Sequence, residues 1–358
     1  MKRAIVILTL LIFALALWMS HSSSKRLNKK SVLENSKTNV LAARTAPKHS
    51  SSKARLESDS TNSVLASYDE GSEWKKLSRE QVDAYLLKTK RSPESLLNAF
   101  LETGDTNFLA EAVEKYPNNS IVQWTMLNRA SPEERSQWLE KFKVTSLDNA
   151  LPNYLSALDD LKAGKIDKAL AEMDAANGKH YNAFERERMQ SREEMYLLAG
   201  YSALDARTRG METVPLHNLS EMKALAQEIS VLQQKYKVSG DMASAQQLAA
   251  LGIEASRKLS QPNTPYLINE LVGMAMENIA LRNLDAGTYY DFLGKTAGER
   301  QQELKGQKQE MKDLIPIFSD LYPRLSDTEK MIYSDRLNLY GELDAMKWLK
   351  KTYGSEPK

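Results

Sequence analysis

Apolar residues recur every three or four positions from about residue 79 to the end of the chain, and this spacing predicts α-helices. Serine-led capping signals divide the pattern into segments, and two of these signals place a proline in the first helical turn. The predicted helix starts follow Ser78, Ser92, Ser131 and Ser326, the last of which opens the final helix. No segment alternates apolar and polar residues with β-branched enrichment, so no sheet is expected. The pattern predicts an all-α body of about a dozen helices or slightly more.

Many of the predicted helices are only 10–13 residues long, as in the stretch from Asn107 to Phe142. Helices this short are not stable alone, and each must bury its apolar stripe on its neighbours. Stacked antiparallel pairs joined by short turns meet that need, so we expect an α-solenoid.

The clearest pair of this kind lies between Asn149 and Ala176. Gly164 ends one apolar run and Ala169 follows it at a five-residue spacing. Small residues at such places let two helices approach closely. Large and small apolar residues mark the facing sides of the two helices: Tyr154 and Ala157 on the first, Met173 and Ala176 on the second. This region resembles a tetratricopeptide repeat, which implies a right-handed solenoid of antiparallel helix pairs.

The resemblance continues unevenly along the chain. Gly240 and Ala245 repeat the five-residue spacing, 76 residues after the first pair. Two looser matches are shifted by one position, at Gly104–Ala110 and at Gly341–Ala345, and Tyr116–Asn119 looks like a repeat-ending turn. The array is therefore degenerate. The whole chain is also similar to exported bacterial helical-repeat proteins to which no activity is assigned.

The first twenty residues differ from the rest. Met1-Lys2-Arg3 precedes sixteen residues in which only Thr9 is polar, a pattern typical of a secretory signal peptide. An uncleaved membrane anchor is the alternative, although the run falls short of the roughly 20 residues that a spanning helix needs. Lysine and arginine residues follow the run closely and oppose export of the chain after it. We expect export, with residues 1–20 cleaved or kept as an anchor.

Composition divides the chain into four parts. Residues 21–76 are rich in Ser, Lys and Asn and are expected to form a disordered basic linker. Residues 77–260 are assigned to the tetratricopeptide-like repeats, and residues 261–358 to a helical region that continues or caps them. Residues 1–76 carry a net charge of +7 and residues 77–358 a net charge of −5.

The charge and cysteine count exclude several classes of function. An acidic body argues against nucleic-acid binding, which needs a basic face for the phosphates. The chain has no cysteine, so disulfides, thiolate zinc sites and thiol nucleophiles are excluded. The basic linker could contact anionic lipid or wall polymer.

Three motifs could carry chemistry, and each has a simpler interpretation. Gly294-Lys295-Thr296 is half of a phosphate-binding loop, but Tyr289 stands where the motif requires glycine. Ser220 and Lys223 have the spacing of penicillin-recognising enzymes, without that family's companion motifs. His180 and His217 are the only histidines after the linker and lack metal-ligand spacing.

Other features could belong to a surface or a hinge. The charged runs Glu185–Arg188 and Arg192–Glu194 could supply paired carboxylates, but their alternating signs favour a solvated, salt-bridged face. Gly306 and Pro316 interrupt a long helical stretch and mark a hinge or a simple kink. Five aromatic residues could line a peptide groove, but their helical spacing is more typical of core residues: Trp124, Trp138, Tyr154, Tyr196 and Tyr201.

These observations favour a non-enzymatic scaffold in the cell envelope that binds a protein or peptide partner. No catalytic, cofactor-binding or metal-ligating residue is assigned. The first alternative is a structural envelope protein held to membrane or wall by residues 21–76. The second is a solenoid-type cell-wall enzyme, whose expected Glu-Ser motif occurs only as Glu57-Ser58 and Glu94-Ser95, in the wrong context.

Overall fold

The computed structural model describes residues 76–212, 216–260 and 264–354. The predicted signal or anchor, residues 1–20, and all but the last residue of the predicted linker lie outside them. All of the described residues except Lys76 belong to one compact unit that begins at Leu77. They are mostly α-helical, with almost no strand, which agrees with the predicted all-α class. In this part of the chain no helix is both long and apolar enough to cross a membrane.

The described residues contain fifteen α-helices. The first seven are short: α3 Arg79–Lys88, α4 Pro93–Thr103, α5 Thr106–Lys115, α6 Ser120–Leu127, α7 Pro132–Thr145, α8 Leu151–Lys162 and α9 Ile166–Ala175. The next five are α10 Glu185–Leu198, α11 Ala203–Glu212, α12 His217–Ser239, α13 Met242–Leu259 and α14 Leu267–Leu281. The last three are α15 Ala297–Leu321, α16 Asp327–Tyr340 and α17 Glu342–Tyr353, with a 3₁₀ turn at Tyr322–Arg324.

The predicted helix starts are confirmed by their capping geometry. Ser78, Ser131 and Ser326 each accept a hydrogen bond from the third backbone N–H of the helix, and the Gln or Glu at that position bonds back. Ser92 caps α4, and Pro93 occupies its first turn. These caps satisfy backbone donors that a helix would otherwise leave without partners, so they define where each helix begins.

Each of the two close helix pairs that the sequence predicts has a glycine after its first helix and a buried alanine in its second. Gly164 and Gly240 have φ of +73° and +84°, the left-handed conformation that ends α8 and α12. Ala169 and Ala245 are buried in the helices that follow, α9 and α13. Each pair, α8 with α9 and α12 with α13, packs directly together.

Three details differ from the sequence-based expectation. The predicted final helix is two helices, because Gly341 has a φ of +90° and separates α16 from α17. Gly306 and Pro316 do not interrupt α15, which runs through both residues. A two-residue antiparallel hairpin, β1 Tyr289–Tyr290 with β2 Lys295–Thr296, lies before α15 although no sheet was expected.

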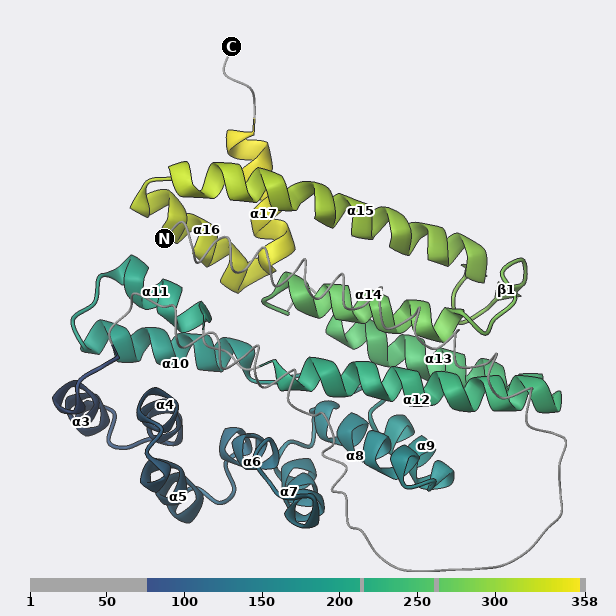
Figure 1. Cartoon of the computed structure of the whole chain (residues 1–358), viewed down its shortest axis with the longest axis horizontal. Helices are drawn as coiled ribbons and strands as arrows, with labels where there is room; N and C mark the ends of the chain where they lie inside the picture. The colour runs from purple at the N-terminus through teal and green to yellow at the C-terminus, as the bar shows by residue number, and fades with distance from the viewer. Residues whose placement is uncertain (1–75, 213–215, 261–263, 355–358) are drawn as a thin grey trace, which may run out of the picture. The chain divides into compact units, whose positions relative to one another are not determined.

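The chain also turns back on itself at α10. Figure 1 shows α3 to α7 nearly end-on, with α10 lying across this group and α12, α13, α14 and α15 following in successive layers. The Asn98 side chain of α4 donates to the Ser191 hydroxyl of α10 at 3.1 Å, so the contact is direct. One apolar core therefore joins α3–α6 to α10 and α11.

Candidate functional site

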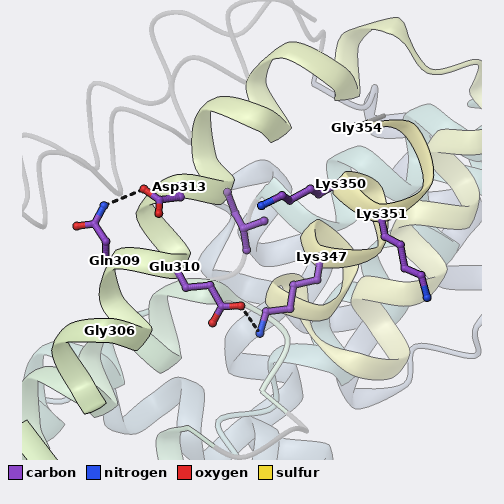
Figure 2. Close-up of a pocket in the computed structure, with 9 residues that line it drawn as sticks. Gly306, Gln309, Glu310, Asp313, Lys347, Lys350, Lys351 and Gly354 are labelled. Carbon is purple, nitrogen blue, oxygen red and sulfur yellow. Dashed lines mark hydrogen bonds and ion pairs between the residues drawn. The ribbon is translucent and has the colours of Figure 1, made fainter. Parts of the chain in front are cut away.

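A groove between α15 and α17 is open to solvent and has charged walls (Figure 2). Its volume is about 680 Å³. Gly306, Gln309, Glu310 and Asp313 line the α15 wall, with the buried Leu314 beneath them, and Lys347, Lys350, Lys351 and Gly354 line the α17 side. A helix spacing of three and four residues puts the α15 residues on one face. This volume is in the range of ligand-binding clefts.

The two walls carry opposite charges that are only partly paired. Lys347 forms an ion pair with Glu310 at 3.0 Å, and both side chains are about half exposed. Asp313 accepts a hydrogen bond from the Gln309 amide at 2.8 Å. Among the described residues, neither the Lys350 nor the Lys351 side chain has a hydrogen-bond or ion-pair partner. Figure 2 shows Lys350 reaching across the groove toward α15 and Lys351 pointing away from it. The groove therefore offers an unpaired ammonium group to a ligand.

A second groove, of about 620 Å³, lies among α7, α8 and α9. Its central charges neutralise one another: Lys143 bonds to Glu172 at 2.7 Å, and the Asn153 amide donates to the same carboxylate at 2.7 Å. Lys179 in turn donates to the Asn153 side-chain oxygen at 2.8 Å. These groups already bind one another, whereas the side chain of Lys168, which also lines this groove, has no hydrogen-bond or ion-pair partner among the described residues.

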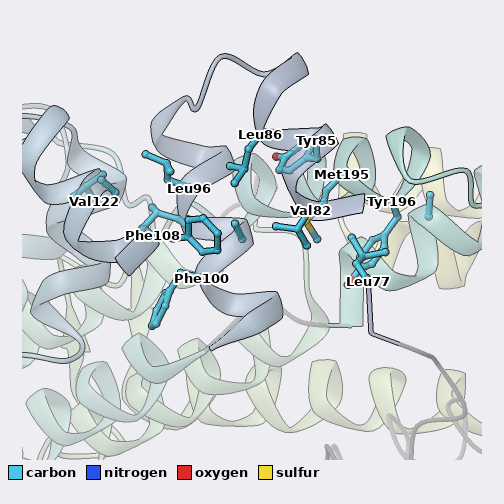
Figure 3. Packing of buried hydrophobic residues seen from close by; sticks show 14 residues of the cluster. Leu77, Val82, Tyr85, Leu86, Leu96, Phe100, Phe108, Val122, Met195 and Tyr196 are labelled. Carbon is cyan, nitrogen blue, oxygen red and sulfur yellow. The ribbon is translucent and has the colours of Figure 1, made fainter. Parts of the chain in front are cut away.

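The charged runs of α10 are only partly solvated: Glu187 and Glu194 are exposed, but the predicted solvated face is wrong for the other charged residues except the half-buried Arg186. Glu185, Arg188, Arg192 and Glu193 are all less than a tenth exposed. Arg192 and Tyr196 share the Glu102 carboxylate of α4, the tyrosine at 2.7 Å. Figure 3 shows Met195 and Tyr196 among the apolar residues of α3 and α4. Helices distant in sequence cover α10 on sides that its charge pattern assigns to solvent.

Glu185 is the most enclosed of these carboxyls. It is the first residue of α10 and follows Phe184, whose φ of +60° is unusual for a residue with a side chain. The Asn269 amide nitrogen of α14 donates to both Glu185 oxygens, at 3.1 and 3.0 Å. Burial raises the pKa of Glu185 to about 7, and the hydrogen bonds from Asn269 and Asn218 offset part of that rise.

Two further carboxyls with raised pKa values surround the start of α14. The Glu342 carboxylate accepts the backbone N–H of Leu267 at 2.7 Å, and burial raises the Glu342 pKa. Burial raises the pKa of Glu270 to about 7, while the nearby Lys347 acts in the opposite direction. Perturbed carboxyls often mark catalytic sites. Here, however, neither groove is lined by Glu185, Glu270 or Glu342. The hydrogen bonds of Glu185 and Glu342 instead connect α10 and α17 to the start of α14, which gives these carboxyls a structural role.

The three chemical motifs lie apart in the structure. Gly294 occupies the turn of the hairpin with a φ of +67°, and Thr296 caps α15 through a capping box with Glu299. The Ser220 hydroxyl donates to the His217 carbonyl at 2.8 Å, within the first turn of α12. His180 pairs through its backbone with Asp148 and Ala150. No three potential metal-binding side chains cluster anywhere in the described ranges.

The aromatic residues divide between core and surface. Trp124, Tyr154 and Tyr196 are buried, as their helical spacing favours. Trp138 and Tyr201 are partly exposed, and the Lys141 ammonium nitrogen lies over the Trp138 ring, 4.2 Å from its centroid. None of the five lines the groove between α15 and α17. Sequence reasoning identified Gly306 as a helix irregularity but missed Lys350, because only the tertiary fold brings α17 beside α15.

Comparison of the chain with known protein families, with curated proteins and with solved structures finds no match in any of the three.

Proposed function

We propose that the protein is a non-enzymatic helical scaffold that binds a protein or peptide partner in the groove between α15 and α17. The observation that carries the proposal is this groove, whose α17 wall presents Lys350 without a partner beside an α15 wall of exposed polar side chains. A preformed, partly charged groove on rigid helices recognises a partner by shape and charge.

The finer architecture belongs to the same proposal. The close pairs α8–α9 and α12–α13 support a right-handed solenoid of antiparallel, tetratricopeptide-like pairs over residues 77–260. Residues 261–358 then cap that array and supply the binding groove. The signal-like pattern of residues 1–20 supports an exported or membrane-tethered location in a bacterial cell envelope.

The alternative is a structural envelope protein held to membrane or wall by the basic residues 21–76. Site-specific photo-crosslinking of the full-length chain in its own cells separates the two. A photoreactive residue in place of Lys350 or of Gln309 samples the two walls of the groove. The same residue in place of Lys308, which is exposed on α15 but does not line the groove, is the matched control.

We expect the Lys350 and Gln309 positions to crosslink to the same protein and the Lys308 position not to do so. Equal crosslinking at all three positions, or none at the two groove positions, would contradict the proposal. Loss of envelope association on removal of residues 21–76, with no groove-specific adduct, would favour the structural alternative.

A further inference from the structure

Gly306 has no explanation within the fold of the described residues. Glycine in a helix interior costs about 0.5–1 kcal/mol relative to alanine. At Gly210, Gly252, Gly273 and Gly298, the other helical glycines, an added Cβ would meet a neighbouring atom within 3.3 Å. At Gly306 an added Cβ would meet nothing within 4 Å. The helix packing that accounts for those four glycines therefore does not account for Gly306.

What lies beside Gly306 is the groove. Helical glycines elsewhere in this chain mark places where another segment approaches closely, and the same requirement at Gly306 points to a segment that is supplied from outside. A missing side chain lets a main chain lie against the helix backbone. A groove with a glycine in its wall fits an extended peptide better than a flat lipid surface.

The charge near the groove selects the kind of peptide. Two lysines that line the groove, Lys350 and Lys351, have no side-chain hydrogen-bond or ion-pair partner among the described residues. Glu310 is neutralised by Lys347, which leaves Asp313 as the uncompensated acid of the groove wall. The groove lining carries three lysines against two acids, a net charge of +1, whereas residues 77–358 as a whole have a net charge of −5. An acidic occupant complements the groove, and a basic one does not.

The lysines of α17 also have a local role. Lys350 and Lys351 lie in the last turn, where cations interact favourably with the helix dipole. That role needs no groove and leaves Gly306 unexplained. It also predicts that reversing these charges would lower the stability of α17 without a specific effect on a ligand.

We infer that the groove between α15 and α17 binds an extended acidic peptide segment of a partner protein. The inference rests on the proposed function and names the partner class for the same groove. The backbone of the segment lies against Gly306, and one of its carboxylates meets the Lys350 ammonium group. A rise of about 1.5 Å per residue places Gly306 and Asp313 about 10 Å apart along α15, the length of about three extended residues.

The test measures fluorescence anisotropy with the full-length chain in a mild non-ionic detergent. The probes are labelled peptides of about six residues in which Glu, Gln or Lys alternates with Ser. We expect the Glu peptide to bind and its affinity to fall as salt rises, because salt screens the attraction between exposed charges. Binding of the Gln or Lys peptide with equal affinity would overturn the acidic class.

Two variants locate the binding. Gly306→Gln fills the groove without removing a charge, and Lys350→Glu reverses the key charge. Each variant is expected to bind the Glu peptide more weakly, with a Kd raised by about tenfold or more. Lys308→Glu makes the same charge change outside the groove and should weaken binding less than about threefold, through long-range attraction alone. Equal losses for Lys308→Glu and Lys350→Glu would overturn the groove as the site.

Two controls keep the outcomes distinct. Circular dichroism of each variant shows whether α17 is still folded, and unimpaired binding by a folded Gly306→Gln variant would overturn the inference. Nanodiscs of anionic phosphatidylglycerol serve as a competing lipid surface. If they displace the Glu peptide equally from the wild type and from all variants, the groove is not the site and a lipid site is indicated instead. If groove-specific crosslinking succeeds while the Glu peptide does not bind, the acidic class fails and the proposed function stands.

Discussion

At the scale of single residues, burial of Glu185 makes stability depend on pH. The folded-state pKa is about 7, above the usual value of 4.5, so the folded chain keeps a proton that the unfolded chain releases between these values. Stability from this residue is therefore full below about pH 4.5 and is lost as pH rises through 7. This pKa shift means that folding is less favourable by about 3 kcal/mol when Glu185 is ionised than when it is protonated.

Glu185→Gln removes this titration while keeping the shape of the side chain. We expect the difference in free energy of unfolding, variant minus wild type, to increase from pH 5 to pH 8 by on the order of 3 kcal/mol. Urea unfolding at a series of pH values measures the difference. Glu187→Gln, at an exposed position of the same helix, is the control and should show no comparable increase. A pH-independent difference for Glu185→Gln would refute the buried titration.

At the scale of helices, the sequence predicts the ends better than the faces. Ser78, Ser131 and Ser326 carry the signal locally, because a cap and its partner lie three residues apart. The burial of α10 has no such local signal. Its charges alternate as on a solvated helix, and the residue that pairs with Arg192 is Glu102, ninety positions away. The groove was unpredictable for the same reason, since α15 and α17 meet only in the folded chain.

Gly306→Ala tests whether glycine costs α15 stability. The added methyl group meets nothing within 4 Å and favours the helix, so we expect the free energy of unfolding to rise by about 0.5–1 kcal/mol. Gly273→Ala is the matched control, because its Cβ would lie 2.9 Å from the Ser256 carbonyl oxygen and should destabilise α14. Chemical denaturation of both variants gives the comparison. Destabilisation by Gly306→Ala would show that the fold itself requires this glycine.

At the scale of the whole molecule, α10 departs from a simple repeat array. In a solenoid each repeat contacts only its neighbours. Here α10 packs on α4, and Tyr85 and Asn98 both bond to Ser191. Such long-range contacts join α3–α6 to α10 and α11 in one core. The groove lies outside this core, between α15 and α17, which pack directly on each other.

We propose that this molecule binds a partner through α15 and α17. Hydrogen–deuterium exchange of the full-length chain, with and without the protein captured by crosslinking at Lys350, tests this proposal most directly. We predict that binding slows exchange in the two segments that line the groove, 303–314 and 346–354, and leaves α3–α9 unchanged. Slower exchange in α7–α9 alone, or no change in α15 and α17 at saturating partner, would contradict the account.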